Sequence, residues 1–434
     1  MSKNLSRRRF ITGAGLTAAA AFTPLGPAAV FSPTGASAAN GRLIPNPKIG
    51  TITYSQRDVP TRLGIAASAA LGVAPTMGYL GGPDFPHDPT DLGPLVPLPG
   101  GWLELFEFLA KAGFRQIEFA GYGQHASNPG GNAPNPAPGG TTTAESRAAY
   151  LAYARTLRGF LDSFGLEAIG NHGYVPNTWN GPNSAGGAMT TEDYNRLQTE
   201  LEFASILGMP FMGTGNDPTS PNNRNIEPWT IAGEKWNALN EISVKQWGIQ
   251  MYTHNHAPAY HFLQDGPMVT VTQDRITGAP ITPRQVRGES GKRLMQQYLD
   301  VTDPKLVVIE MDVYWAHVAR HQHRWRYDWN GNRVEDIFDP TAQVAKQTKR
   351  YALFHAKDGD ATTQPAGVGD GYSMIPFGDP RSDINYSGFF RGIGAKGWHN
   401  PNYEQDNAPG GNADPGQSLR FSKISAAGMA GLRG

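Results

Sequence analysis

The chain has 434 residues, with equal numbers of basic and acidic side chains (37 each), 39% hydrophobic residues and no cysteine. Without cysteine the chain can form neither disulfides nor thiolate–metal bonds, so a metal site would have to use His, Asp and Glu. The balanced charge argues against a protein that binds nucleic acid or an anionic membrane surface.

The first 38 residues predict an export signal. The paired Arg7 and Arg8 and the nearby Phe10 precede a Gly- and Ala-rich apolar stretch, and Ala36–Ala38 fits a small-residue cleavage site. Paired arginines in a secretory signal indicate a twin-arginine signal peptide. The alternatives are a membrane anchor or an unstructured tail. Glycines and prolines interrupt the apolar stretch, so we expect no stable membrane anchor.

Removal of this signal would leave residues 39–434 as the mature protein. Four of the 37 basic residues and none of the 37 acidic ones lie in the signal, which leaves 33 basic against 37 acidic residues, a net of −4. We expect recognition by the twin-arginine export machinery and a periplasmic or extracellular location. The remaining length allows two domains. The pattern of its elements instead favours one enlarged domain, with a core at about residues 48–430.

Strand-like and helix-like runs alternate along this part of the chain. The strand-like runs are 49–54, 116–120, 167–171, 210–213, 249–254, 306–312, 352–355 and 398–404. The main helix-like runs are 102–112, 143–164, 190–207, 229–247, 291–299 and 340–350. Eight strands with intervening helices predict an α/β protein, a single (β/α)8 TIM barrel. A doubly wound open sheet is the structural alternative, but eight units favour closure.

Segments rich in Gly, Pro, Asn or other polar residues follow several of these strands. They cover residues 80–100, 126–142, 176–189, 261–290 and 359–380. In a parallel barrel such segments lie at the C-terminal mouth, where loops build substrate pockets. We therefore expect long loops around the mouth.

Four polar residues stand at or near the ends of strand-like runs in the C-terminal half: His254, Asp312, His355 and Glu404. Successive members are 58, 43 and 49 positions apart, which is about one strand–helix unit each. The C-terminal strand ends of a closed parallel barrel meet at one mouth, so we expect these side chains to converge. Two imidazoles and two carboxylates suit a divalent metal of the zinc, manganese or cobalt kind.

Alternation along the strands places further side chains at this mouth, because residues two apart share a face. His256 shares the face of His254 and is a candidate to contact substrate. Glu310 shares the face of Asp312 but lies deeper, so we expect Asp312 as the metal ligand and Glu310 as a partner behind it.

Lys357 lies two positions after His355 and therefore shares its face. An ammonium at the mouth can hold a sugar oxygen or stabilise an enolate. The alternative is a simple ion pair between Lys357 and its neighbour Asp358. Other candidates for substrate contact, from strand ends and the start of the sixth loop, are Glu118, Tyr122, His172 and Trp315.

Five motifs carry a family resemblance. Gly50–Asp58 resembles a G-x-x-x-Y-S-x-R-D first strand, Leu109–Tyr122 a first helix and second strand, Gly248–His256 an H-N-H strand, Asp312–Trp315 a D-x-x-W strand end and His355–Asp358 an H-x-K-D strand end. In this order and spacing they resemble the sugar phosphate isomerase/epimerase superfamily, the xylose-isomerase-like TIM barrels that include endonuclease IV. The resemblance runs from about residue 48 to 430 and points to the H-N-H branch.

The resemblance implies a divalent metal (Mn, Co, Zn or Mg) held by His254, Asp312, His355 and Glu404. In the sugar epimerases of this superfamily the fifth-strand ligand is usually a Glu, which acts with the eighth-strand Glu as an acid–base pair. His254 replaces that first Glu, and a metal-bound imidazole does not easily carry protons. Ala259 stands where the H-N-H branch usually has a Glu. Both departures argue against a symmetric two-glutamate mechanism.

The residues and the resemblance together predict a secreted metal-dependent sugar isomerase/epimerase that removes the proton next to a carbonyl and stabilises the enediolate. His256 or Glu404 is the expected base, and Lys357 is expected to stabilise the oxyanion. The alternatives are a keto-sugar lyase or dehydratase, a hydrolase on the same metal site, and a sugar-binding barrel without catalysis. The four-ligand set argues against the last of these.

The expected small-molecule partner is a carbohydrate. A sugar phosphate is disfavoured, because an exported enzyme meets few of them and the sequence has no Gly-rich phosphate-binding motif. The sequence is compatible with a homo-oligomer.

Overall fold

The computed structural model describes residues 41–122, 143–183, 186–360, 373–394 and 398–434. The predicted signal peptide (residues 1–38), the predicted loop at 126–142 and much of the loop at 359–380 lie outside the described residues. In the described part of the chain, no helix has the length and apolar character that a membrane-spanning helix needs.

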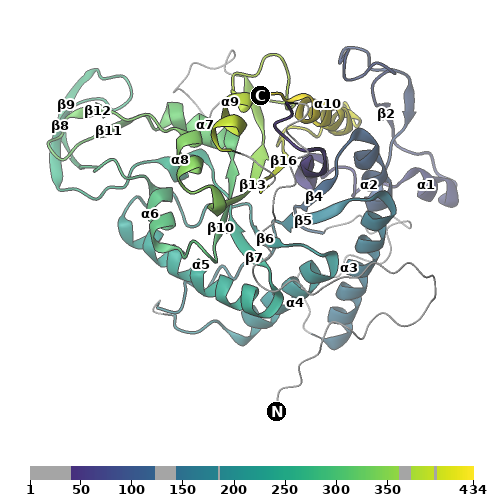
Figure 1. Cartoon of the computed structure of the whole chain (residues 1–434), viewed down its shortest axis with the longest axis horizontal. Coiled ribbons are helices and arrows are strands. Elements are labelled where there is room, and N and C mark those ends of the chain that lie inside the picture. The colour runs from purple at the N-terminus through teal and green to yellow at the C-terminus, as the bar shows by residue number, and fades with distance from the viewer. Residues whose placement is uncertain (1–40, 123–142, 184–185, 361–372, 395–397) are drawn as a thin grey trace. The chain divides into compact units, whose positions relative to one another are not determined.

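Eight parallel strands form a nearly closed barrel, as the sequence predicts (Figure 1). They are β1 (Gly50–Ile52), β4 (Gln116–Phe119), β5 (Glu167–Asn171), β6 (Phe211–Thr214), β7 (Gln250–Thr253), β10 (Val308–Asp312), β13 (Tyr351–Ala356) and β16 (Asn400–Tyr403). Their spatial order β5-β4-β1-β16-β13-β10-β7-β6 follows the chain once β1 is placed beside β16. A parallel bridge between His172 and Gly213 joins the two outer strands of this order, and the Gly173 amide donates to the Gly213 carbonyl (2.8 Å).

Helices pack around the strands (Figure 1). They are α1 (Ile65–Leu71), α2 (Gly101–Ala112), α3 (Ala144–Phe164), α4 (Thr191–Leu207), α5 (Ile226–Trp247), α6 (Leu294–Val301), α7 (Val313–Gln322), α8 (Pro340–Lys346), α9 (Tyr386–Gly392) and α10 (Gln417–Gly431). The predicted helix at 340–350 is divided into α8 and the 3-10 turn Thr348–Arg350.

Local signals set the helix ends. The Thr143 and Thr190 side chains accept hydrogen bonds from the Ser146 and Asp193 amides and so cap α3 and α4. Helix α4 ends at Gly208, which has a left-handed φ of 78° that glycine adopts at little cost.

In the described part of the chain, four two-stranded sheets lie outside the barrel sheet. They are β2 (Met77–Tyr79) with β3 (Leu95–Pro97), β8 (Met268–Gln273) with β9 (Pro280–Arg287), β11 (Trp325–Tyr327) with β12 (Arg333–Glu335), and β14 (Asp358–Asp360) with β15 (Ser373–Ile375). The segment 261–290, predicted as a loop, therefore contains a hairpin. Residues 269–272 are four consecutive β-branched residues, which favours the strand.

The apolar residues form two clusters. The larger lies between the strands and the helices, and the smaller is made of barrel residues: Ile169, Phe211, Tyr252, Val308, Ala352 and Leu353. Val308 and Leu353 each stand two residues before an inward-facing polar residue, Glu310 and His355. The smaller cluster is thus an apolar floor beneath the polar residues at the C-terminal ends of the strands.

Candidate active site

Four buried side chains converge at the C-terminal end of the barrel. His254 follows β7, Asp312 ends β10, His355 lies in β13 and Glu404 follows β16. One potential ligand atom from each lies within 4.8 Å of the others. The structure therefore brings together the four residues that the sequence singled out, which we call the mouth set.

The atoms of the mouth set suit a cation. His254 Nε2 lies 3.6 Å from Asp312 Oδ2, and His355 Nδ1 lies 2.7 Å from Glu404 Oε2. Asp312 Oδ2, His355 Nδ1 and Glu404 Oε2 are buried and make no hydrogen bond of acceptable geometry among the described residues. Buried polar atoms normally have such partners. Imidazole and carboxylate donors at this spacing fit a divalent metal ion.

Lys357 completes this layer. Its Nζ lies 2.9 Å from Asp312 Oδ2, 2.7 Å from Glu404 Oε2 and 3.2 Å from Asp406 Oδ1. Burial alone would lower the pKa of Lys357, but these carboxylates outweigh burial and hold the pKa well above its usual value. The predicted alternative of an ion pair with Asp358 is wrong. Asp358 instead accepts hydrogen bonds from the Gly359 and Gly378 amides.

The two mouth carboxylates differ in their protonation. Burial raises the pKa of Asp312 to about 6, although Lys357 opposes the shift. Burial also acts to raise the pKa of Glu404, but the positive charges of His355 and Lys357 outweigh it and hold the pKa well below its usual value. Glu404 is therefore the more strongly ionised of the two.

His256 lies at the more open side of the site. Its side chain is 39% exposed, its Nδ1 lies 3.4 Å from Asp217 Oδ2, and its amide donates to Asp217 Oδ1 (2.8 Å). The Trp315 ring lies 5.8 Å from the His256 ring and 5.6 Å from Lys357 Nζ. The predicted catalytic residues His256 and Lys357 and the predicted substrate contact Trp315 are thus neighbours.

A second polar layer lies deeper in the barrel. Glu310 Oε2 lies 2.7 Å from His172 Nε2 and 3.1 Å from His254 Nδ1, and Glu310 Oε1 lies 3.2 Å from His355 Nε2. Glu118 Oε2 accepts from Asn402 Nδ2 (2.9 Å) and lies 3.2 Å from His355 Nε2. Burial and the negative charge of Glu310 raise the pKa of Glu118 to about 7.

Two of the predicted substrate contacts, Glu118 and Tyr122, therefore lie in the protein interior and not at the open side of the site. Glu118 is fully buried within the barrel, where Tyr252 also donates to it. The ring of Tyr122 stacks on Phe203 at 4.0 Å, in the core between strands and helices.

Sequence reasoning missed Asp217 and Asp406. Asp217 stands three residues after β6, so the rule that applies to the other strand ends would have found it. Asp406 shares the alternation of Glu404 and was equally accessible. Asp217 follows a strand end that supplied no candidate, and Asp406 lies two residues beyond the candidate Glu404.

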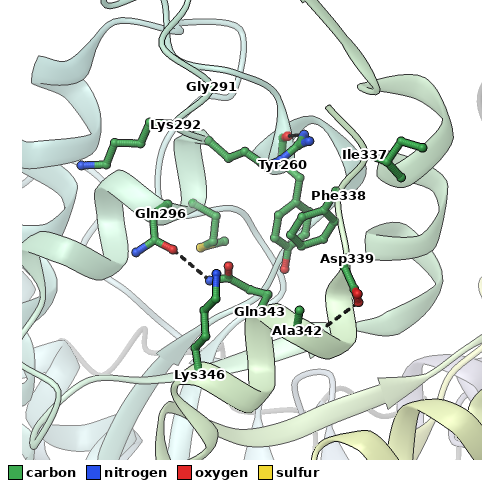
Figure 2. Close-up of a pocket in the computed structure, with 12 residues that line it drawn as sticks. Tyr260, Gly291, Lys292, Gln296, Ile337, Phe338, Asp339, Ala342, Gln343 and Lys346 are labelled. Atoms are coloured by element: carbon green, nitrogen blue, oxygen red, sulfur yellow. Dashed lines mark hydrogen bonds between the residues drawn. The ribbon is translucent and has the colours of Figure 1, made fainter. Parts of the chain in front are cut away.

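A surface pocket of about 270 Å³ lies elsewhere, between the start of α6 and α8 (Figure 2). Tyr260, Phe338 and Gln343 are among its lining residues, and Gln343 donates to Gln296 across it (3.2 Å). Tyr260 also donates to Asn255 Oδ1 (3.1 Å), which connects the pocket wall to the loop that carries His254 and His256.

No protein-family model matches this chain, and no curated protein matches it. Solved structures are similar to it at low sequence identity. A sugar phosphate isomerase/epimerase from Parabacteroides distasonis is 18% identical, covers 93% of this chain and 99% of its own, and has a TM-score of 0.49. A probable 3-DHS dehydratase from Bacillus anthracis is 12% identical over 89% of this chain and 99% of its own, with a TM-score of 0.45.

A xylose isomerase domain protein from Alicyclobacillus acidocaldarius is 12% identical over 76% of this chain and 94% of its own, with a TM-score of 0.41. Several of the similar solved structures are thus xylose-isomerase-like sugar phosphate isomerase/epimerase barrels. At these identities the likeness concerns the fold alone, which the order of the eight strands already defines.

Proposed function

We propose that this protein is a metal-dependent isomerase or epimerase that removes the proton next to the carbonyl of a sugar. The observation that carries the proposal is the convergence of four buried metal-ligand side chains with the Lys357 ammonium at one end of the barrel. His254, Asp312, His355 and Glu404 would hold the ion. A divalent metal held there supplies Lewis-acid polarisation of a carbonyl oxygen.

Lys357 provides fixed positive charge beside the reacting oxygen. Its ammonium is held by three carboxylates and is 2% exposed, so it has little freedom to reorient. A preorganised charge of this kind stabilises an oxyanion that develops when the neighbouring proton leaves.

His256 is the better placed of the two candidate bases. Its side chain is 39% exposed, whereas that of Glu404 is 7% exposed and lies against Lys357 and His355. Asp217 holds the imidazole in place, as a carboxylate does in other general-base pairs. Return of the proton to the adjacent carbon gives isomerisation, and return to the opposite face gives epimerisation.

Elimination from a keto-sugar is the second candidate, and the greater exposure of His256 than of the other imidazoles described at this site favours it. A symmetric epimerase needs proton-transfer groups on both faces of the sugar, but His256 is the exposed one here. After His256 takes the α-proton, the bond from the β-carbon to its oxygen substituent breaks, the carbon–carbon double bond forms, and the departing oxygen takes a proton back from the His256 imidazolium. A hydrolase on the same metal site is a further alternative.

The test of the reaction is proton exchange. The protein purified without chelator is analysed for metal and then incubated in D2O with free sugars and 3-keto sugars, followed by proton NMR. Deuterium at the α-carbon without loss of a group supports an isomerase or epimerase, and an eliminated product supports a lyase. Metal-loaded protein that exchanges no α-proton in any of these sugars would contradict the proposal.

The metal ligands are tested separately from the reaction. His254→Ala removes an imidazole of the mouth set, so bound metal should fall well below one per chain, as measured by elemental analysis of folded protein. Asp217→Ala, which removes the partner of His256, is the control and should keep its metal. Stoichiometric metal in His254→Ala would remove the mouth set as the binding position.

We also propose export by the twin-arginine route, which the paired Arg7 and Arg8 support. Replacing both with lysine should leave uncleaved protein in the cytoplasm, detected by fractionation and mass spectrometry. Mature protein outside the cytoplasm from this variant would show that another route is used.

A further inference from the structure

The deeper polar layer has the composition of a second metal site. His172, His254, Glu310 and His355 each offer a ligand atom, and these atoms lie within 4.8 Å of one another. We call these four residues the interior set. His172 and His254 directly follow β5 and β7, and Glu310 and His355 lie within β10 and β13. A Cβ at Gly215 would lie 2.5 Å from His172 Nδ1, so glycine there leaves room for the ring.

The charges of the two layers are balanced differently. Asp312 and Glu404 share the ammonium of Lys357. Glu118 and Glu310 are fully buried, and within the described residues their ion pairs come from imidazoles alone. Two carboxylates removed from water need compensating positive charge. Protonated His172 and His355 can supply it, and a single divalent ion between three neutral imidazoles would supply it in their place.

The donors also suit such an ion. Three imidazoles with one carboxylate are a typical donor set for zinc and other first-row divalent metals. Glu310 Oε1 is buried and makes no hydrogen bond of acceptable geometry among the described residues, although it faces His355 Nε2 at 3.2 Å. Glu118, which contacts His172 and His355, would complete or support the shell.

We propose that the interior set binds a divalent transition-metal ion at a position separate from the mouth set. The two positions share His254 and His355 through opposite ring nitrogens: His254 Nδ1 and His355 Nε2 face the interior, whereas His254 Nε2 and His355 Nδ1 face the mouth. A neutral imidazole has one ring nitrogen with a free lone pair. The two positions therefore compete for these rings.

This inference does not depend on the proposed reaction, since it concerns where an ion sits in protein without sugar. An ion in the interior set would be enclosed by protein groups, as structural metals are. It would join four of the eight strands and stabilise the folded chain as its concentration rises.

The first test uses the wild-type chain with Zn²⁺ at one equivalent. X-ray absorption spectroscopy counts the imidazoles around the ion, which are three for the interior set and two for the mouth set. Three imidazoles support the proposal. Two imidazoles overturn it, and Glu310 would then be a hydrogen-bond acceptor that turns His254 toward an ion at the mouth.

The second test compares matched variants in a Zn²⁺ competition titration against a chromophoric chelator. His172→Ala and Glu310→Gln alter the interior set alone, and Asp312→Asn alters the mouth set alone. We expect affinity to fall about 10- to 100-fold or more in the first two and to change little in Asp312→Asn. Equal losses in all three variants, or a loss confined to Asp312→Asn, overturn the proposal.

Circular dichroism identifies any variant that fails to fold. If a variant does not fold, the X-ray absorption measurement on the wild-type chain alone decides between the two metal positions. Failure of the interior position appears in these metal measurements without sugar. Failure of the proposed reaction appears instead as absent proton exchange in protein whose metal content is complete.

Discussion

Two clusters of buried charge in this chain can be compared directly. In the hairpin region, Glu289 is fully buried, and its two oxygens accept from Arg275 (2.8 and 2.9 Å), Arg224 (2.8 Å) and the Tyr327 amide (3.1 Å). In the barrel, four buried atoms make no hydrogen bond of acceptable geometry among the described residues: Glu310 Oε1, Asp312 Oδ2, His355 Nδ1 and Glu404 Oε2.

The difference indicates what each cluster is for. A buried carboxylate whose oxygens are fully paired has no capacity left for a ligand, so the Glu289 cluster serves to join the β8–β9 and β11–β12 hairpins. The barrel carboxylate oxygens instead meet His355 and Lys357, each of which is shared between carboxylates at 2.7–3.2 Å, so the hydrogen-bonding capacity of the four barrel atoms is not filled. Their concentration at the end of the barrel favours a ligand there, and the same reasoning leads to both proposed metal positions.

Removal of the central carboxylate of the hairpin cluster should have the largest effect on stability. Glu289→Ala leaves Arg224 and Arg275 partly buried without their shared partner. Breaking a buried ion pair in this way typically costs about 3–5 kcal/mol. Urea denaturation should show this loss in the free energy of unfolding, while folded Glu289→Ala retains its bound metal.

The neighbouring Arg324–Glu335 pair supplies the control. Glu335 is 42% exposed at its side chain, so Glu335→Ala should change the free energy of unfolding by less than about 1 kcal/mol. If the two variants lose similar amounts, saturation of the buried carboxylate is not what makes the hairpin cluster structural.

A substitution in the barrel cluster should lower the rate of the proposed reaction rather than the stability of the fold. Lys357→Met keeps the length of the side chain and removes the charge that faces Asp312 and Glu404. Loss of one oxyanion-stabilising group typically lowers the rate about 100- to 1000-fold. Deuterium exchange at the α-carbon should fall by this factor while the metal content of the same sample stays unchanged.

Lys346→Met is the matched control, because Lys346 is an exposed lysine of α8 that lines the surface pocket (Figure 2). It should exchange at the wild-type rate. Near wild-type exchange in Lys357→Met would instead make this lysine a structural counterion, and His256 would then carry the proposed chemistry without it.

The sequence predicts the barrel well for a physical reason. Strand and helix periods are local properties, and the eight strand runs were each placed within three residues of the observed strands. Alternation also placed Glu310 behind Asp312, as the structure has them. Helices α9 and α10 were not predicted, since their Gly- and Ser-containing sequences, YSGFFRG and QSLRFSKISAAGMAG, give a weak apolar stripe.

Contacts between distant segments were harder to predict. The stacking of Tyr122 on Phe203 depends on where α4 lies relative to the segment that follows β4, which no spacing within either segment determines. The pairing of Lys357 with Asp406 rather than Asp358 likewise depends on where β16 lies beside β13. Residue type and strand position thus indicate which side chains reach the mouth, whereas partner choice requires the assembled barrel.

Glu200 is a buried carboxylate of a third kind, intermediate between those of the hairpin and barrel clusters, because the group that hydrogen-bonds to it is a neutral hydroxyl. This buried carboxylate accepts from the Tyr150 hydroxyl (3.0 Å), and burial raises the pKa of Glu200 to about 7. A carboxyl whose pKa is higher in the folded state favours folding when protonated. The contribution of protonated Glu200 to the free energy of unfolding is complete below the unfolded-state pKa of about 4.5, and it is lost as the pH rises to the folded-state pKa of about 7.

Glu200→Gln keeps the shape of the side chain and removes this titration. Relative to wild type, the variant should gain on the order of 1–3 kcal/mol of unfolding free energy on going from pH 5 to pH 8, because the wild-type carboxyl must be deprotonated in the core at the higher pH. Urea denaturation at the two pH values measures the difference. Glu192→Gln, at an exposed position in the first turn of the same helix, should show no such gain. If Glu200→Gln follows the wild-type pH dependence, then the carboxylate is stabilised in its ionised form by its surroundings, which include the Tyr150 hydroxyl and the charge of Arg196.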